Sequence, residues 1–430
     1  MRATLGCLLL MLATFARADG YLFTDVRIFD GVSDRLRPGH VLVEDGIITK
    51  VSSAPLAAGD GTVVIDGGNR VLSPGFIDLH VHLTMHVPAD QSGRHTTLFG
   101  AYAVDVAAFY LRHGFTTIRD AGGTHPDLAR AINSGSIPGP RVFPSGAIVS
   151  QTAGHGDWRL PSDAHPTHAG TSPYLAGDNA VLADGVDQTL VAVRENLKNG
   201  ATQIKIMGGG GVMSEFDPIH TLQPSPAEIR AAVQAAGDWG TYVLAHAYTS
   251  EAVTRLVENG VRCIEHGLLI DDATARLVKN NDVAISTQIT IFKTLPDLPG
   301  LSDNNRDKAR LVAAGLDNLI GLIRKYDILT GFSTDFILGH YDRLPEEFVN
   351  RGRYWSPAEV LNQATAQSAE IIRRAGKLNR HGNFGEIREG WVADLLLING
   401  EPLEDLAIFR DPDNALALIM KDGVVVSSSL

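Results

Sequence analysis

Cysteine is scarce in this sequence, with only Cys7 and Cys263 in 430 residues. Residues 1–18 have the pattern of a secretory signal peptide, in which a basic residue precedes an apolar run and the small residues Ala16 and Ala18 precede the cleavage site. Cleavage there leaves one cysteine, so we expect no intramolecular disulfide. The sequence predicts a periplasmic or secreted protein that depends on its core or on subunit contacts for stability.

The sequence also has fewer basic than acidic residues and few long apolar runs. The formal net charge is −12, and removal of residues 1–18 takes away Arg2 and Arg17 and makes it −14. This acidity argues against a nucleic-acid partner. No apolar stretch after the signal segment is long enough to cross a bilayer, so we expect no membrane partner.

The two ends of the sequence have the same β character. Strand-like runs separated by turn signals fill residues 20–70, among them the hairpin turn Asp45-Gly46, and similar runs follow at 394–399 and 415–426, the latter broken at Asp422-Gly423. We expect the two ends to pair into one small β domain made of residues 19–70 and 383–430. The alternative, two unrelated β tails, would leave strand edges exposed.

Between the ends, residues 71–382 alternate short strands with helices. The predicted strands are 76–82, 116–119, 142–149, 203–207, 242–247, 263–266, 283–287 and 329–334. The predicted helices are 99–113, 128–133, 186–199, 226–239, 250–259, 271–280, 303–326 and 357–374. Eight such units indicate an α/β fold of the (β/α)8 TIM barrel type. An open doubly wound sheet is the alternative, although the sequence has no glycine fingerprint for a dinucleotide.

Polar residues mark the predicted strand ends, where the chemistry of such a barrel is located. His80 and His82 are two apart on the first strand and therefore point to the same face, where two imidazoles can share a metal ion. The other strand-end residues are Lys205, His246, His266 and Asp335. Each alone has a structural explanation, such as a core histidine or a helix cap. Their recurrence at matching strand ends favours a shared site.

The residue types suggest two divalent ions, with zinc as the default for a histidine-rich hydrolytic site. His80, His82 and Asp335 can hold one ion, and His246 and His266 the other. A protonated Lys205 beside two cations would be repulsive. A buried neutral lysine can instead react with carbon dioxide to give a carbamate (N6-carboxylated Lys205), which can bridge the two ions together with a hydroxide.

The string Pro74-Gly-Phe-Ile-Asp-Leu-His-Val-His82, the residues Lys205, His246 and His266, and Ser333-Thr-Asp335 resemble the amidohydrolase superfamily in its two-metal form. The segments 152–157, 205–214 and 245–249 are similar to its Xaa-Pro dipeptidase-like and imidazolonepropionase-like branch, which includes ochratoxin-degrading amidohydrolases. The resemblance implies a composite β-sandwich beside the barrel and a homo-oligomer.

The resemblance also implies residue roles. Asp335 would take the proton of the attacking hydroxide and pass it to the leaving amine, while His155 and Tyr248 would contact the substrate carbonyl or carboxylate. Tyr248 could instead be an aromatic residue at the pocket rim. Phe336, which stands where many relatives have a small residue, would narrow the pocket.

Three histidines and a glycine run have less specific signals. His165 and His168 lie with His155 in a long polar loop, 154–179, which is typical of an active-site lid, and we expect both to be solvated. His340 follows the eighth strand and is a candidate substrate contact. Glycines 208–211 lack the Gly-Lys-Ser/Thr of a P-loop, so we expect them to allow close approach of the backbone to substrate.

These observations favour hydrolysis of an amide next to a free carboxylate by a metal-bound hydroxide. The expected substrates are dipeptides with a C-terminal phenylalanine, proline or other apolar residue, and N-acyl amino acids; ochratoxin A, a phenylalanine amide, also fits. One alternative is a mononuclear deaminase or cyclic-imidate hydrolase of the imidazolonepropionase kind, which would not need a bridging Lys205. The other is a non-catalytic periplasmic binding protein, which would have lost metal ligands, and none is missing.

Overall fold

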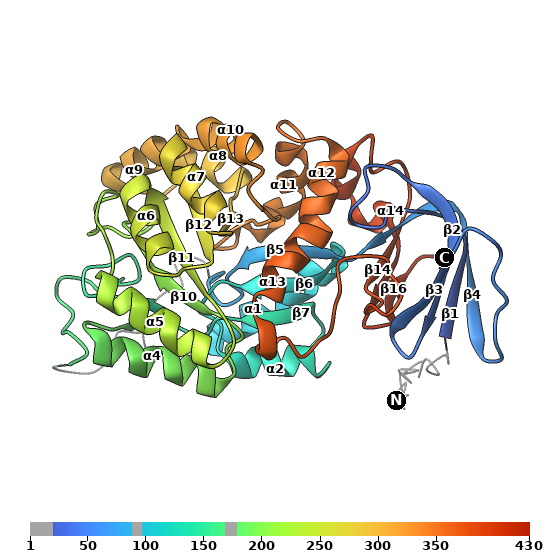
Figure 1. Ribbon diagram of the computed structural model, residues 1–430, viewed down its shortest axis with the longest axis horizontal. Coiled ribbons are helices and arrows are strands. Elements are labelled where there is room, and N and C mark those ends of the chain that lie inside the picture. Colours follow the sequence, from blue (N-terminus) through green and yellow to red (C-terminus); the bar gives the residue numbers. More distant parts are fainter. Residues whose placement is uncertain (1–19, 88–96, 168–178) are drawn as a thin grey trace, which may run out of the picture.

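The computed structural model describes residues 20–87, 97–167 and 179–430. The predicted signal peptide and His168 lie outside these residues. Within them, a barrel of strands and helices adjoins a β-sheet domain built from both ends of the chain (Figure 1). No helix in the described part of the chain combines the length and apolar character needed to span a bilayer.

Parallel strands form the barrel wall, as predicted. They are β5 (Phe76–Val81), β6 (Phe115–Asp120), β7 (Arg141–Pro144), β8 (Ile148–Ser150), β10 (Ile204–Met207), β11 (Val243–Thr249), β12 (Cys263–Leu269) and β13 (Ala284–Ser286), with β9 (Ala180–Leu182) paired to β8. The prediction of one strand over 142–149 was wrong, because the chain turns at Gly146, whose φ is +73°, and divides the segment into β7 and β8.

The eighth predicted strand, 329–334, is reduced to a single bridge between Thr330 and Ile285. Its backbone still closes the barrel. The amide of Ile285 donates to the carbonyl of Leu329, and the amide of Leu79 on β5 donates to the carbonyl of Phe332, each at 2.9–3.0 Å. This closure brings the residues after 334 beside the end of β5.

Helices cover the outside of the barrel (Figure 1). They are α1 (Thr97–Arg112), α2 (Pro126–Asn133), α4 (Val186–Asn199), α5 (Pro226–Asp238), α6 (Ser250–Glu258), α7 (Asp272–Asn280), α8 (Thr290–Thr294), α9 (Asp303–Ala313), α10 (Leu316–Tyr326), α11 (Leu344–Arg351), α12 (Pro357–Asn362) and α13 (Ser368–Arg373). The prediction of one helix over 303–326 was wrong, since the segment forms two helices that are separated at Ala314 and Gly315. Gly315 packs so closely on the Leu268 carbonyl that a Cβ would lie 2.1 Å from its oxygen, so only glycine fits there.

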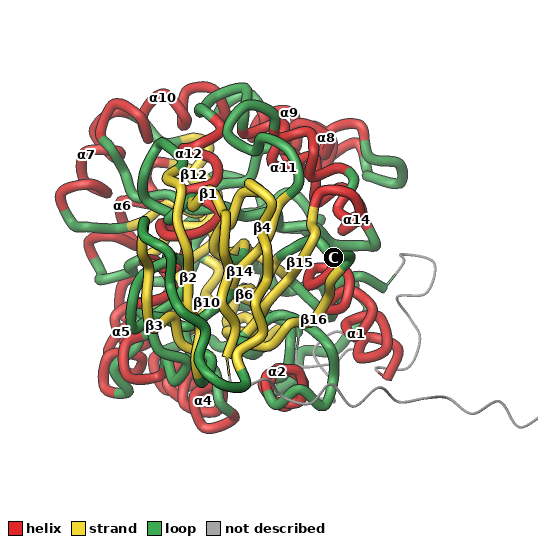
Figure 2. The backbone as a smooth tube through the Cα atoms, turned by 90° about the vertical axis from the view of Figure 1, so that its right-hand side faces the viewer, coloured by secondary structure: helices red, strands yellow, loops and turns green. Residues whose placement is uncertain are grey.

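The two ends of the chain pair into one seven-stranded sheet (Figure 2). Its order is β16 (Val424–Ser428), β15 (Leu416–Lys421), β14 (Leu395–Ile398), β4 (Thr62–Pro74), β1 (Gly20–Ile28), β2 (Arg37–Glu44) and β3 (Ile47–Ser52). One apolar cluster draws residues from strands at both ends, including Phe23, Val41, Leu397 and Met420, so the sheet folds around its own core as a sandwich does. The predicted domain boundary at residue 70 falls inside β4, which runs into the barrel.

A buried ion pair ties the barrel to the sheet domain. Arg141 on β7 donates from Nη1 to Asp394 at 2.5 Å and from Nη2 to Asp422. Arg141 is 1% exposed and the side chain of Asp394 is 2% exposed. Burial opposes the charge of Arg141, but the two carboxylates more than offset it and raise its pKa.

We expect Asp394→Asn to lower the free energy of unfolding by up to about 3–5 kcal/mol, the cost of breaking a buried ion pair, because it removes the more deeply buried of the two carboxylates and leaves only Asp422 to balance Arg141. Urea denaturation checks this. Asp282→Asn, which removes an exposed carboxylate from its salt bridges with Arg262 and Arg374, is the matched control and should change stability by less than about 1 kcal/mol. Equal effects of the two substitutions would contradict the structural role of the buried pair.

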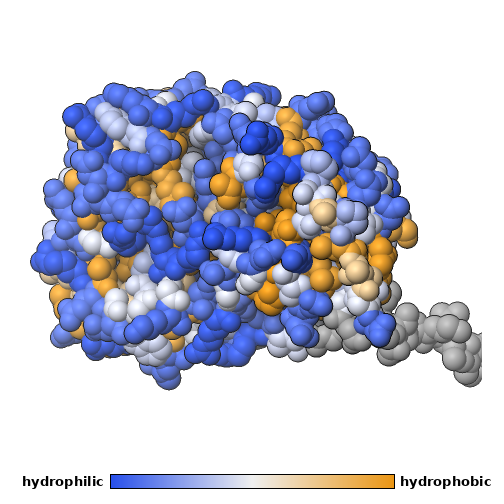
Figure 3. Space-filling view, turned by 45° about the vertical axis from the view of Figure 1, so that its right-hand side comes forward, coloured by the Kyte–Doolittle hydropathy of each residue, from blue (hydrophilic) through white to orange (hydrophobic). Residues whose placement is uncertain are grey.

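The molecular surface is mainly hydrophilic on the face in Figure 3, with apolar patches among the charged residues. The exposed apolar side chains include Val63 and Val64 on β4 and Val424 and Val426 on β16. β16 is an edge strand of the sheet.

Candidate active site

His80 at the end of β5 and His82 just after it face each other across 3.1 Å between their Nε2 atoms. Each ring is oriented by its other nitrogen. Nδ1 of His80 lies 2.7 Å from Glu265, and Nδ1 of His82 lies 2.7 Å from the carbonyl of Gly122. Both Nδ1 atoms meet oxygen acceptors, so they carry the proton, and both Nε2 atoms present lone pairs.

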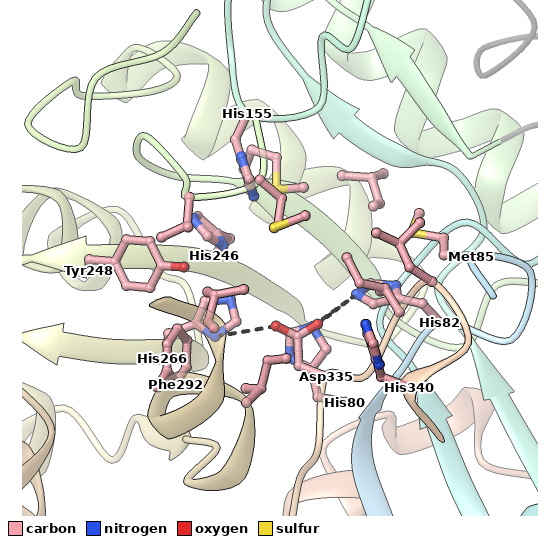
Figure 4. A pocket seen from close by; sticks show the side chains of 18 of the residues that line it. His80, His82, Met85, His155, His246, Tyr248, His266, Phe292, Asp335 and His340 are labelled. Carbon is pink, nitrogen blue, oxygen red and sulfur yellow. Dashed lines mark hydrogen bonds and ion pairs between the residues drawn. The ribbon is translucent and has the colours of Figure 1, made fainter. Parts of the chain in front are cut away.

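Asp335 adds a third acceptor to this pair. Its Oδ1 atom is 3.3 Å from Nε2 of both His80 and His82 (Figure 4). The backbone positions it, since the Asp335 amide donates to the His80 carbonyl at 2.8 Å. Asp335 has a φ of +55°, a left-handed conformation that is strained for this residue and is typical of a functional position.

These three groups fit a divalent cation. Two imidazole lone pairs and a carboxylate oxygen converge with no proton between them, an arrangement that is repulsive unless a positive charge lies in the middle. Among the described residues, His80, His82 and Asp335 are the only set of three such side chains gathered closely enough to hold one ion. The sequence had predicted this grouping.

His246 on β11 and His266 on β12 form a second group beside the first. Their ring centroids are 4.6 Å apart, and Nδ1 of His266 is 3.9 Å from Asp335. Nδ1 of His266 also lies 2.8 Å from Gln288, which leaves Nε2 available as a ligand. His266, like Asp335, has a positive φ, at +77°.

Lys205 lies on β10 within the same pocket and is 1% exposed. Ile204 and Ile206 on either side pack into the main hydrophobic core, so the lysine projects to the other face of the strand, into the barrel. Burial lowers the pKa of Lys205 below its ordinary value, although Glu265 and Asp335 act in the opposite direction. A lowered pKa makes the neutral amine, the reactive form, more accessible.

Four histidines of the pocket, His80, His155, His246 and His266, favour their neutral form. Burial lowers the pKa of His80 and of His155 to about 3, and it lowers the pKa of His246 and His266 as well. Neutral imidazole is the form that ligates metals. Burial would raise the pKa of Asp335, but the facing histidines, led by His80, hold it well below its usual range.

Tyr248 and His155 lie at the rim of the two groups (Figure 4). Tyr248 on β11 is 4% exposed, and its hydroxyl points toward the centre of the pocket. Burial raises its pKa well above the ordinary value, so it remains a proton donor. The ring of His155 lies 4.2 Å from that of His246, and its Nδ1 is 2.6 Å from Ser214.

The glycine run 208–211 makes room for His155. A Cβ on Gly211 would lie 1.9 Å from the His155 ring, so only glycine permits this packing. The run thus brings backbone close to a pocket histidine. His340 also lines the pocket, as predicted, while His165 lies in the polar loop near Thr152, 2.8 Å from its hydroxyl.

Glu265 and Arg119 are two important residues that the sequence analysis missed. Glu265 accepts from Nδ1 of His80 and, at 2.6 Å, from Nη2 of Arg119, and all three side chains are at most 1% exposed. A carboxylate on the far nitrogen fixes the orientation of a ligating histidine. The available signal was a charged residue within an apolar strand, the same signal that identified Lys205.

Comparisons with known proteins agree with this geometry. The model of the amidohydrolase family matches residues 71–426. The chain belongs to this family. It is 30% identical to an ochratoxinase of Aspergillus niger over 412 residues, which cover 92% of this chain and 84% of the relative.

Solved structures extend the likeness to the whole fold. An amidohydrolase structure matches with a TM-score of 0.88 and 37% identity, over 96% of this chain and all of the other. A prolidase in complex with N-methylphosphonate-L-proline also matches with a TM-score of 0.88, at 32% identity over 95% of this chain and all of the other. The amidohydrolase chain described here is therefore a hydrolase of amide or peptide bonds with a TIM barrel and a β-sandwich domain. The alternative of a non-catalytic binding protein is set aside.

Proposed function

We propose that this amidohydrolase uses two divalent ions, with zinc as the default, to cleave the amide of a substrate that carries a free carboxylate. The observation that carries the proposal is the meeting of three proton-free acceptors, from His80, His82 and Asp335, beside a second histidine pair. Lys205 lies buried in the same pocket and would bridge the ions as a carbamate. A mononuclear deaminase or cyclic-imidate hydrolase would leave this lysine and the histidine pair without a shared role.

The side chains divide the chemistry among them. When bound, the ions would supply an activated water and polarise the scissile carbonyl. Asp335 would accept the proton of the attacking water and return it to the leaving amine. Tyr248 keeps its proton and can donate to the developing oxyanion, and His155, a neutral imidazole, can hydrogen-bond the carbonyl or carboxylate of the substrate.

The substrate class rests on the similar proteins. The prolidase was solved with an N-substituted proline, and the Aspergillus relative is an ochratoxinase. We propose C-terminal phenylalanine, proline or other apolar dipeptides and N-acyl amino acids as substrates. Hydrolysis of ochratoxin A to ochratoxin alpha and phenylalanine is a fortuitous activity of the same kind.

Two further predictions accompany this function. The signal-like segment at residues 1–18 supports a periplasmic or secreted location, and the exposed valines on β4 and β16 would suit a homo-oligomer contact. Fractionation of the expressing cells and light scattering of the purified protein test them.

A screen of dipeptides and N-acyl amino acids with the metal-reconstituted enzyme tests the proposed function. We expect release of the amino acid from carboxylate-bearing amides and no ammonia from nucleobases or cyclic imidates. Asp335→Asn, which removes the proposed proton acceptor, is the inactive control. Deamination without amide cleavage would favour the mononuclear alternative.

We expect Tyr248→Phe to lower kcat by about 10²–10³, the usual effect of losing one oxyanion donor, and to change KM much less. The reason is that the contact forms mainly in the transition state. Steady-state kinetics on the best substrate of the screen measure both constants. Tyr354→Phe removes a hydroxyl that bonds Asp317 and does not line the pocket, and it should leave both constants unchanged. An unchanged kcat in Tyr248→Phe would make this residue a rim aromatic only.

A further inference from the structure

A second, larger compartment adjoins the active-site pocket and shares part of its lining. The inner compartment, which holds the histidines and Asp335, has a volume of about 90 Å³. The outer one has about 380 Å³, and Met85, Trp158 and Met213 line both. Small-molecule sites usually need 300–1,000 Å³, so most of a dipeptide-sized substrate must lie in the outer compartment.

The outer compartment is mainly apolar, and three charged side chains, Asp157, Arg159 and Glu215, lie in its wall. Phe99, Met213 and Leu338 contribute apolar surface, and Asp157 and Arg159 form an ion pair at its side. Nε and Nη2 of Arg159 donate to the two oxygens of Asp157 at 2.7 and 2.8 Å. The exposed fraction of these side chains is 11% for Arg159 and 7% for Asp157.

The two hydrogen bonds to Asp157 fix the orientation of the Arg159 guanidinium and do not involve its Nη1 atom. Among the described residues, Nη1 of Arg159 has no hydrogen-bond acceptor. An arginine held by a carboxylate on one edge keeps the donors of its other edge for a ligand, and carboxylates are the anions that match these donors best. Arg159 is thus a fixed guanidinium, and it is the one cationic side chain that the described residues contribute to the wall of the outer compartment.

No other described side chain in either compartment offers a comparable charge. Among the described residues that line the two compartments, the only other lysine or arginine is Lys205 at the barrel floor, beside the proposed ligands. His155 and His340 line the inner compartment and not the outer one. A substrate carboxylate that enters the outer compartment therefore has Arg159 as its cationic partner.

We propose that Arg159 binds the α-carboxylate of the amino acid that leaves, and that the side chain of this amino acid packs in the outer compartment among Met85, Phe99 and Met213. The proposal rests on the proposed function, because it assigns one half of the carboxylate-bearing amide. It adds a specificity-determining residue and places the leaving amino acid. The scissile amide then lies at the inner compartment, beside Asp335 and Tyr248.

The test compares N-benzoyl-L-phenylalanine with its carboxamide, N-benzoyl-L-phenylalaninamide, by benzoate release. The wild-type enzyme should prefer the acid by about 10- to 100-fold in kcat/KM, the range of a hydrogen bond to a charged group. Arg159→Gln should abolish this preference by raising KM for the acid, with the carboxamide changed by less than about threefold. Arg130→Gln breaks an exposed Arg–Asp pair on α2 and should keep the preference.

Three outcomes would overturn the assignment. The first is a preference for the acid that survives in Arg159→Gln, and the second is the absence of any preference in the wild-type enzyme. The third is an equal loss of kcat/KM on both substrates in Arg159→Gln, which would indicate a structural role only. If neither compound is hydrolysed, the substrate screen described above decides the proposed function, and calorimetric binding of the same two compounds to the wild type and Arg159→Gln decides the Arg159 assignment separately. If Arg159→Gln does not fold, Arg159→Lys replaces it, and it should lose most of the preference because lysine lacks the fork that Asp157 holds.

Discussion

Lys205→Ala should abolish amide hydrolysis, with a loss of more than about 100-fold, because even residues that only support a metal ligand cost 10–100-fold when changed. The variant should also lose at least one of the two ions. Elemental analysis measures the ions per chain, and circular dichroism should show that the fold is retained.

The physical reason lies in the burial of this lysine. Lys205 is 1% exposed, and an ammonium group there would face both desolvation and, in the loaded enzyme, two nearby cations. A carbamate changes the charge from positive to negative and offers two oxygens, which resolves both problems at once. Addition of ¹³C-labelled bicarbonate to the wild type should give a carbamate carbon signal that Lys205→Ala lacks.

Further variants distinguish the carbamate from a simple positive charge at position 205. Lys205→Arg keeps the positive charge, cannot form the carbamate and should be inactive. Short carboxylic acids should partly restore activity to Lys205→Ala by occupying the bridging position. Lys198→Ala, which removes an exposed lysine on α4, should behave as wild type. A fully active Lys205→Arg with both ions bound would rule out the carbamate and leave Lys205 as a charged wall of the pocket.

The sequence was most informative where the regular repeat of side chains along a strand determines which face a residue occupies. His80 and His82 are two residues apart on a strand, so their shared face followed from the period of two. Lys205, flanked by isoleucines, had to point away from the helices for the same reason. Parallel strands end at one edge, so His246, His266 and Asp335 could be placed together before any distance was known.

Contacts that depend on long-range packing could not be predicted in this way. Glu265 reaches His80 only because β12 and β5 face each other across the barrel, and Arg119 completes the pair from a third strand. The close approach of Gly315 to the carbonyl of Leu268 likewise joins residues that are far apart in the sequence. The two compartments are formed by loops that follow several strands, and no local sequence pattern predicts the volume that such loops enclose.

Two divalent ions per chain should be present in the fully active enzyme, and chelation should reduce hydrolysis to background. The argument starts from charge. His80, His82 and Asp335 present three acceptors to one point, and without a cation their mutual repulsion would oppose the observed arrangement. Because ions that bind only the folded chain stabilise it, chelation should also lower Tm, and added zinc should restore both Tm and activity.

Single substitutions should separate the two ion positions. His246→Ala should leave one ion, held by the group around His80, and His82→Ala should release that ion instead. His113→Ala, at a half-buried histidine whose Nδ1 meets the Phe109 carbonyl after α1, is the control and should retain two ions. Elemental analysis and thermal unfolding of each variant measure the outcome. Full activity with one ion or none would contradict the two-ion proposal and would return the site to the mononuclear alternative, with His246, His266 and Lys205 acting only as walls of the pocket.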